Sequence, residues 1–268
     1  MSSQSAPSIS GLFGSLVEGG TVNAAAAQGF FTPDLAAQLG QGGLGVDPGS
    51  VQAGEVFILV EVVDDSGSIR FTSGNAQAVR DGHNLVLDAL NGSKQKSGVV
   101  MRSTYLNGKV LSNFALIEDV PRMTAQNYDP NGGTPLYDAM AEAVAATAAK
   151  IQEFEDNGVT ARAVIVVITD GHDEGSRKYT PAKLEPVVTS LLKSERVIVC
   201  GMGISDGYTD FRSIFRSVGV EDRWILTPGN SPSEIRAAFG AVSQTAQRAS
   251  QSGANFSQQA TGGGFTSP

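Results

Sequence analysis

The strongest signal for the fold is the segment Val56-Phe-Ile-Leu-Val-Glu-Val-Val63, which is followed directly by Asp64-Asp65-Ser66-Gly67-Ser68. The first part is rich in β-branched residues and almost wholly apolar, as expected of a parallel strand that is covered on both faces. The second part places a carboxylate and two hydroxyls at alternate positions. Because open α/β sheets bind ligands beyond the carboxyl ends of their strands, Asp64, Ser66 and Ser68 are predicted to lie at the functional edge.

Two later segments also lead into side chains that carry oxygen. Asn131-Gly132-Gly133-Thr134-Pro135-Leu136 opens a predicted helix, and the apolar run 163–168 ends in Thr169-Asp170-Gly171. Hydroxyl and carboxylate oxygens suit a small hard dication, so the three loops are predicted to share one Mg²⁺ or Mn²⁺ ion. Each motif alone also has a structural interpretation, in which Ser-Gly-Ser is a turn, Thr134 is a helix N-cap and Pro135 is the first helical residue.

In this order and spacing, the D-x-S-x-S, G-G-T-P-L and T-D-G motifs resemble the metal-ion-dependent adhesion site of the von Willebrand factor type A (vWA) domain. The resemblance covers about residues 55–248. It implies that the hydroxyls of Ser66, Ser68 and Thr134 bind the metal directly. It also implies that Asp64 and Asp170 stand behind these hydroxyls, mostly through water, and that the sixth position is left for a Glu or Asp of a partner protein.

Neutral hydroxyls next to the ion, with carboxylates behind them, leave the ion electron-poor and attractive to an incoming carboxylate. We therefore expect a divalent-cation-dependent protein-protein interaction module, and not an enzyme. Two segments, Ser176-Arg-Lys-Tyr-Thr180 and Phe239-Gly-Ala-Val-Ser243, make the chain similar to bacterial cytoplasmic members of the family, including tellurite-resistance (TerY-like) proteins. That resemblance implies a stress-response system with kinase, phosphatase or AAA+ ATPase partners.

Two other functions stay open. A metal-dependent phosphatase could use the same loops, but neither Ser66 nor Ser68 has an evident basic partner in the sequence and no general base is visible. A structural or assembly protein of a phage or filament would instead make its contacts through the Gly- and Ala-rich termini, with the metal incidental. The role of Asp65 also stays open, since it either faces away from the ion or helps to retain it.

Composition narrows the class of partner. The formal net charge is −8 and the Lys and Arg residues are scattered singly, which argues against nucleic acid. The single cysteine, Cys200, excludes a disulfide within the chain and is expected to pack as a small apolar group. The N-terminus lacks a basic region followed by an apolar stretch, and no run of about 18 apolar residues occurs. The sequence therefore predicts a cytoplasmic protein with no membrane partner.

Between residues 55 and 248, predicted strands and helices alternate. Strands are expected at 55–63, 98–106, 109–118, 162–169, 196–202 and 223–227. Helices are expected at 74–91, 135–156, 181–194, 208–217 and 232–248. The dipeptide Asn107-Gly108 predicts a hairpin between the second and third strands. This order predicts an α/β fold with a doubly wound, mostly parallel six-stranded sheet, one antiparallel edge strand and helices on both faces.

The two ends differ from this domain in composition. Residues 1–54 are rich in Gly, Ala and Ser and are expected to form an extension outside the core, either a flexible tail or a segment that folds on a partner. Within it, Thr32 is predicted to cap a short helix that starts at Pro33. Residues 249–268 are polar and Gly-rich and are predicted to be a flexible tail.

Three further features have structural interpretations that we favour. His172-Asp173-Glu174 is expected to be a solvated loop, although it could extend the site. His83 lies within a predicted helix and is expected to be structural, because one imidazole without a nucleophile supports no acid–base chemistry. Gly201-Met202-Gly203 lacks the third glycine of a dinucleotide fingerprint, so a dinucleotide site is not expected.

Overall fold

The computed structural model describes residues 8–251 and residue 265. Its centre is a six-stranded sheet with the strand order β3-β2-β1-β4-β5-β6. The strands are β1 (Glu55–Val63), β2 (Val99–Tyr105), β3 (Val110–Leu116), β4 (Thr160–Thr169), β5 (Val197–Gly203) and β6 (Ile225–Leu226). All neighbouring strands are parallel except β2 and β3, which are antiparallel. The predicted doubly wound sheet with one antiparallel edge strand is confirmed.

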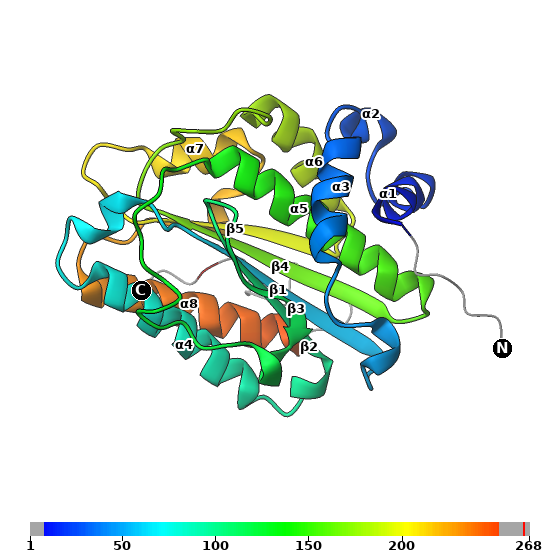
Figure 1. Cartoon of the computed structure of the whole chain (residues 1–268), viewed down its shortest axis with the longest axis horizontal. Coiled ribbons are helices and arrows are strands. Elements are labelled where there is room, and N and C mark those ends of the chain that lie inside the picture. The colour runs from blue at the N-terminus through cyan, green and yellow to red at the C-terminus, as the bar shows by residue number, and fades with distance from the viewer. Residues whose placement is uncertain (1–7, 252–264, 266–268) are drawn as a thin grey trace.

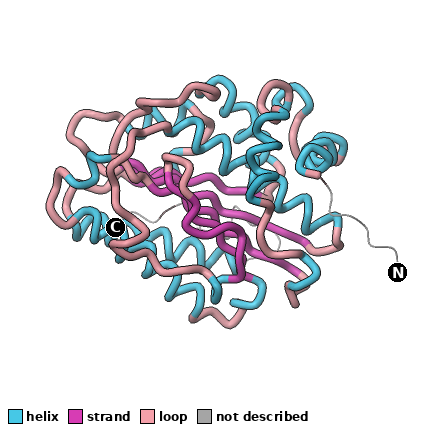
Figure 2. The backbone as a smooth tube through the Cα atoms, viewed as in Figure 1, coloured by secondary structure: helices cyan, strands magenta, loops and turns pink. Residues whose placement is uncertain are grey.

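Helices cover both faces of the sheet, so that the strands lie in the middle layer (Figure 1, Figure 2). On one face α4 packs against α8, and on the other lie α5, α6 and α7. The bounds of these helices are α4 (Asn75–Asn91), α5 (Leu136–Asp156), α6 (Pro181–Lys193), α7 (Phe211–Ser217) and α8 (Pro232–Ser250). Among the described residues, no helix is both long enough and apolar enough to cross a bilayer.

The two central strands bring the ends of the predicted loops together. β1 and β4 run parallel with Val63 opposite Ile168, and the amide of Asp64 donates a hydrogen bond to the Ile168 carbonyl at 2.9 Å. Every residue of β1 after Glu55 is buried, as the continuous apolar run predicts for a strand covered on both faces. Asp64 and Asp170 therefore emerge side by side at the carboxyl edge of the sheet.

Residues 9–42 form three helices, α1 (Ile9–Glu18), α2 (Ala24–Ala27) and α3 (Pro33–Gly42), which pack against α5 and α6 (Figure 1). The expectation that residues 1–54 lie outside the core is wrong for the described part of that segment. Its large apolar side chains are buried in the same core as those of the sheet: Leu12, Phe13, Leu16, Val22, Phe30, Leu35 and Leu39. The segment folds on its own chain.

The physical reason is the outer face of α5. This helix is buried almost all round, including Ala145, Ala148 and Ala149, and a helix that is apolar all round needs a second layer over it. Lys150, also on α5, is fully buried and donates to the Val46 carbonyl and to the Glu153 carboxylate. Burial lowers the pKa of the Lys150 ammonium. The N-terminal segment therefore completes the packing of α5.

Local signals set the ends of two elements as predicted. The Thr32 hydroxyl accepts a hydrogen bond from the Leu35 amide at 3.2 Å, so Thr32 caps α3 and Pro33 is its first residue. Gly108 has a φ of 82° in the turn that joins β2 to β3, a conformation that glycine adopts without strain.

The proposed C-terminal tail falls mostly outside the described residues, but Phe265 contacts the Trp224 ring edge-on.

The G-x-G sequence at the end of β5 has a packing role. A Cβ added to Gly201 or Gly203 would lie 2.4 Å and 2.1 Å, respectively, from ring carbons of Phe215 and Phe211 on α7. The two glycines thus let the aromatic rings of α7 approach the strand. Cys200, in the same strand, is fully buried, as predicted for a free thiol in the core.

Candidate metal-binding site

The first residue of the candidate site is the fully buried Asp64, directly after β1. Its Oδ1 accepts a hydrogen bond from the Ser66 amide at 2.7 Å. Its Oδ2 accepts one from the Thr169 hydroxyl at 2.7 Å and one from the Asp170 amide at 3.2 Å. These bonds join the loop after β1 to the loop after β4, and the buried Asp64 carboxylate takes part in all of them.

The hydroxyls of Ser66 and Ser68 converge on the other carboxylate. Their Oγ atoms lie 2.9 Å apart. Both donate to Oδ1 of Asp170, Ser68 at 2.6 Å and Ser66 at 3.3 Å. The structure therefore brings together four of the five predicted ligands through direct hydrogen bonds.

Thr134, the fifth predicted ligand, is buried and lies beside the loop after β4. A Cβ placed on Gly171 would be 3.9 Å from the Thr134 hydroxyl, and the Glu174 amide donates to the Thr134 carbonyl at 2.9 Å. The loop that carries Thr134 also contacts the first loop, because the Gly67 amide donates to the Gly132 carbonyl at 3.1 Å. All three predicted loops meet at one place.

The alternative role of Thr134 as the N-cap of the following helix is wrong. Helix α5 begins at Leu136, with Pro135 in the N-cap position, and no cap bond to a side chain at that position is formed. The first amides of α5 are capped from the loop after β4: Tyr137 donates to the Asp173 carboxylate and Asp138 to the Ser176 hydroxyl. The Thr134 hydroxyl is thus not used to cap the helix.

Asp65 faces away from the other carboxylates. Its Oδ1 accepts hydrogen bonds from the backbone amide and the side-chain amide of Asn107, at 3.1 Å and 2.7 Å. The same Asn107 side chain donates to the Gly133 carbonyl at 2.9 Å. Of the two possibilities left open for Asp65, the structure favours the first, that it faces away from the ion. Its contacts with Asn107 link the hairpin between β2 and β3 to the metal-site loops.

The site concentrates negative charge away from water. Burial is the largest cause that raises the pKa of the Asp64 carboxyl. Burial and the nearby charge of Asp64 raise the pKa of the Asp170 carboxyl to about 6, although the hydrogen bonds from Ser68 and Ser66 lower it. Within residues 8–251, no ion pair joins either carboxylate to a Lys or Arg. A buried and a half-buried carboxylate with no such ion pair form a site that a cation would stabilise.

The donor atoms fit a hard dication. Two carboxylates and three hydroxyls supply oxygen alone, which suits Mg²⁺ or Mn²⁺ better than Zn²⁺. In the described part of the chain, no three His, Cys, Asp or Glu side chains come together as a metal site of another kind. Ser66, Ser68, Thr134, Asp64 and Asp170 are thus the described residues that could hold such an ion.

Two supporting residues were not assigned a role from the sequence. Thr169, within the T-D-G motif, holds Asp64 through its hydroxyl. The buried Tyr128 donates its hydroxyl to the Asp64 carbonyl at 2.6 Å and packs against Tyr105. The position of Thr169 in the motif was an available signal, whereas the long segment that contains Tyr128 has no pattern that points to the site.

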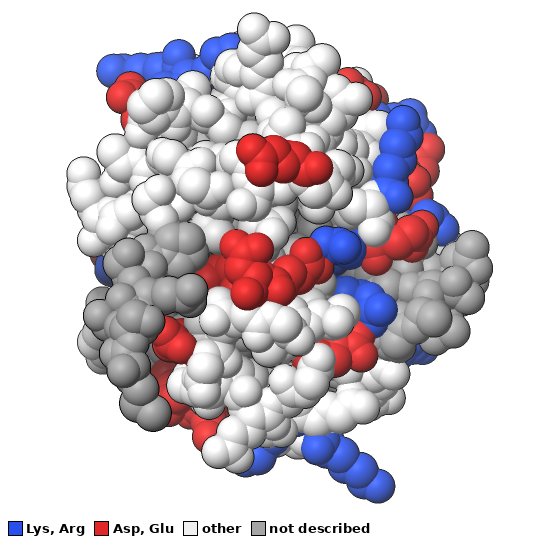
Figure 3. Space-filling view, turned by 90° about the vertical axis from the view of Figure 1, so that its right-hand side faces the viewer, with Lys and Arg blue, Asp and Glu red and all other residues white. Residues whose placement is uncertain are grey.

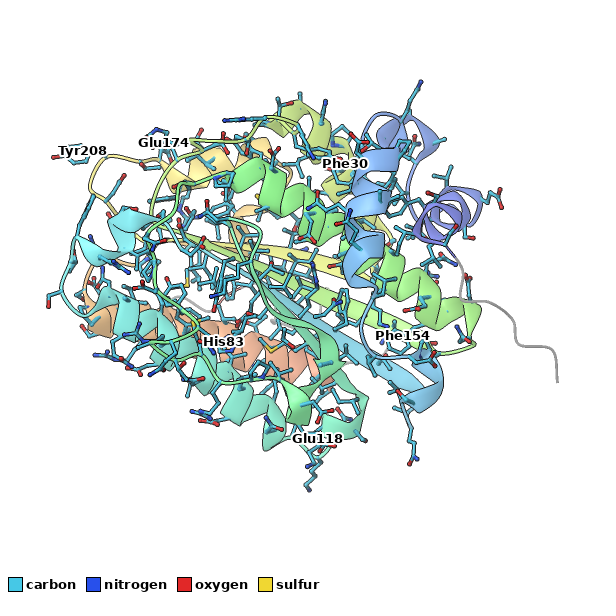
Figure 4. All side chains as sticks on the ribbon, in the orientation of Figure 1. Phe30, His83, Glu118, Phe154, Glu174 and Tyr208 are labelled. Carbon is cyan, nitrogen blue, oxygen red and sulfur yellow. The ribbon has the colours of Figure 1, made fainter. Side chains whose placement is uncertain are left out.

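The two histidines have the roles that we favoured. His172 and Glu174 are exposed and lie 3.3 Å apart as a surface pair. His83 is fully buried on α4, facing the sheet (Figure 4), and its Nδ1 lies 2.6 Å from the Glu61 carboxylate on β1. Glu61 lies on β1 just before the metal-site loop, but its partner is His83 and not a loop residue.

The fold is similar to those of several solved structures. For the pilus adhesin SpaC from Lactobacillus rhamnosus GG, the TM-score is 0.53 and the identity is 16%, over 72% of this chain and 31% of SpaC. For the SpRpn10 VWA domain, the TM-score is 0.48 and the identity 12%, over 70% of this chain and 95% of that one. For the manganese-loaded TRAP protein from Plasmodium vivax, the values are 0.44 and 18%, over 69% and 72%.

These likenesses concern the fold. This chain spans about a third of the length of SpaC, and at 16% identity the likeness shows a shared architecture and not a shared function. The other two likenesses, with TM-scores below 0.5, carry no argument about this chain. No protein-family model and no curated protein matches the sequence. The chain has a six-stranded α/β fold whose architecture is similar to that of part of SpaC.

Proposed function

We propose that this protein is a divalent-cation-dependent protein-protein interaction module of the vWA type, and not an enzyme. Its metal site would be formed by Asp64, Ser66, Ser68, Thr134 and Asp170. When bound, Mg²⁺ or Mn²⁺ supplies a positive centre to which a Glu or Asp of a partner protein can bind.

One observation supports the proposal more than any other. The carboxylates of the buried Asp64 and the half-buried Asp170 are adjacent, and the Ser66 and Ser68 hydroxyls donate to Asp170. Within residues 8–251, no Lys or Arg forms an ion pair with either carboxylate. Such an arrangement is electrostatically unfavourable in a protein without metal, because like charges in a partly dry site repel each other. A bound dication would remove that repulsion, because its positive charge neutralises both carboxylates.

The biological setting that we propose is a bacterial stress-response system of the tellurite-resistance (TerY-like) type, with a kinase, phosphatase or AAA+ ATPase as partner. The support is the segment Ser176–Thr180, which is part of the sequence resemblance. In the structure, the amides of Arg177, Lys178 and Tyr179 donate to the Asp138 carboxylate, so this segment is held against α5 next to the site.

The proposal is tested by titrating the chelator-stripped full chain with Mg²⁺ and Mn²⁺ in a calorimeter. We expect saturable binding at one site. The Ser66→Ala/Ser68→Ala double variant and Asp170→Ala should weaken it at least about tenfold, since even supporting ligands contribute that much at metal sites. Ser73→Ala, an exposed serine five residues after Ser68, is the matched control and should bind as wild type.

Two results would contradict the proposal. A wild-type protein that takes up neither ion has no functional metal site, and the three loops are then structural. Equal binding by wild type and by the double variant would place the ion elsewhere on the molecule.

A further inference from the structure

Two aromatic side chains stand out on the surface of the described residues. Tyr208 is 97% exposed and Phe71 is 87% exposed, whereas the other exposed large hydrophobic residues, Val110 and Leu85, are 47% and 44% exposed. Phe71 lies three residues after Ser68, and Tyr208 lies in the loop that follows β5. Figure 4 shows Tyr208 at the tip of that loop, at the same end of the molecule as Glu174.

The order of the strands places the candidate metal site between these two residues. β4 lies between β1 and β5 in the sheet, and all three strands are parallel. The loop after β4, which carries Asp170, therefore lies between the loop after β1, which carries Phe71, and the loop after β5, which carries Tyr208. The N-terminal helices do not cover this edge, because they pack on α5 and α6 toward the other end of the molecule (Figure 1). That other end, which faces the viewer in Figure 3, carries Lys and Arg among Asp and Glu, without a stripe of one sign.

Both aromatic residues are carried by hydrogen-bonded turns. The Phe71 amide donates to the carbonyl of Ser68 at 2.8 Å, which couples Phe71 directly to the metal-site loop. The carboxylate of Asp206 accepts hydrogen bonds from the amides of Tyr208 and Thr209, at 2.9 Å and 2.7 Å, and from the Thr209 hydroxyl at 2.5 Å. A side chain on a fixed turn loses less conformational entropy when it is bound, so these two are well suited as contact points.

A single exposed aromatic residue is ordinary on a protein surface. Two that are almost wholly exposed, on either side of a charged site, match the composition of protein interfaces, in which aromatic residues are enriched and dominate the binding energy. Burial of either side chain against a partner is favourable, because it removes apolar surface from water. The fold itself gains nothing from their exposure.

We infer that Phe71 and Tyr208 are the apolar contacts of the partner, and that the partner segment carries one Asp or Glu with apolar side chains on both sides. The role of the acidic residue rests on the proposed function, since the metal would bind its carboxylate. The flanking apolar residues would pack on Phe71 and Tyr208.

The test uses two libraries of phage-displayed peptides, selected on the full chain. In the first library a central Asp or Glu is fixed and the flanking positions are random, and selection is done in Mg²⁺. In the second library all positions are random, and selection is done in EDTA. The affinities of the selected peptides are then measured for wild type, Phe71→Ala, Tyr208→Ala and the control Leu85→Ala, which removes a less exposed hydrophobic side chain from α4.

We expect peptides from the first library to have apolar residues next to the acid. Their Kd should rise about tenfold for Phe71→Ala and for Tyr208→Ala and stay unchanged for Leu85→Ala, while the calorimetric Mg²⁺ affinity of all three variants stays that of wild type. If wild type takes up no Mg²⁺, the proposed function fails, and peptides from the second library that lose affinity in the two aromatic variants would still support the apolar contacts. If neither library gives a peptide that distinguishes wild type from the two aromatic variants, the inference is wrong.

Discussion

The Asp170 carboxylate is half-buried, lies next to the Asp64 carboxylate and accepts hydrogen bonds from two serine hydroxyls. Its raised pKa, about 6 against an ordinary 3.8, means that the folded protein without metal binds a proton at this position more tightly than the unfolded chain. A rise of that size corresponds to at most about 3 kcal/mol. This contribution favours folding fully below pH 4 and is lost as the pH rises through 6. The protein without metal should therefore lose stability as the pH rises from about 4 to about 7, and the part of this loss that lies above pH 5 is seen between pH 5 and pH 8.

The Asp170→Asn variant tests this. Asparagine cannot ionise, so we expect the metal-free variant to lose less free energy of unfolding between pH 5 and pH 8 than metal-free wild type. Urea unfolding at both pH values, with and without Mg²⁺, measures the difference. Added Mg²⁺ should stabilise wild type at pH 8 and leave the variant unchanged. The same pH dependence in both proteins would show that Asp170 is not the group responsible.

At the scale of elements, the contact between α4 and α8 depends on one glycine. A Cβ on Gly82 would lie 2.2 Å from ring carbons of Phe239, which is fully buried on α8. Replacing glycine by alanine inside a helix normally stabilises it by about 0.5–1 kcal/mol, because alanine has the higher helix propensity. At Gly82 the overlap with the ring reverses that effect.

We expect Gly82→Ala to lower the free energy of unfolding by about 1–3 kcal/mol, as overpacked cores do. Gly240→Ala is the matched control, since Gly240 lies inside α8 with no atom within 4 Å of an added Cβ. The control should be as stable as wild type or more stable. Chemical denaturation of the three proteins measures the effect, and equal stability of the two variants would mean that α8 moves away without cost.

The beginning of α5 shows how far an element can be predicted. The sequence correctly predicts a helix after the Gly-Gly-Thr-Pro motif, and its last residue, Asp156, is also as predicted. The cap could not be predicted, because the groups that bind the first amides, Asp173 and Ser176, lie far along the chain. The local rule for N-caps favours Thr134, but the loop after β4 supplies the cap instead.

At the scale of the whole molecule, the N-terminal helices belong to the same core as the sheet. Leu16 on α1 is fully buried, and the stacked rings of Phe13 and Phe31 pack against the same core. The Tyr179 hydroxyl donates to the Phe30 carbonyl at 2.8 Å, which links this layer to the loop before α6. Removing residues 1–54 would expose the outer face of α5, so such a truncation cannot separate an assembly role from a folding role.

We expect Leu16→Ala to lower the free energy of unfolding by about 2–5 kcal/mol, the range found for buried leucines. A single cooperative transition should persist, because α1 and the sheet share one core. Leu85→Ala, which truncates an exposed leucine, is the control and should change stability by less than about 0.5 kcal/mol. Fluorescence and circular dichroism followed in urea give both values. A separate early transition would instead show that α1 to α3 unfold independently.

Local sequence patterns are enough to predict the α/β sheet, the hairpin at Asn107-Gly108 and the three loops that meet at the carboxyl edge. These features follow from local patterns: apolar runs that make buried strands, turn residues, and hydroxyls and carboxylates placed directly after strands. Parallel strands then bring their ends together whatever the details of packing. Local patterns are therefore enough to group Asp64, Ser66, Ser68 and Asp170, and hydrogen bonds join these residues in the structure.

The side chains that support this group and the layer that covers α5 depend on long-range contacts, which appear only in the folded chain. The contacts of Asp65 with Asn107 and of Tyr128 with Asp64 join segments that are 42 and 64 residues apart in the chain, and no local pattern encodes such pairs. The packing of residues 9–42 on α5 likewise depends on how much apolar surface the finished sheet leaves uncovered. The positions of Phe71 and Tyr208 on either side of Asp170 follow from the strand order, which is a property of the whole sheet and not of any one segment.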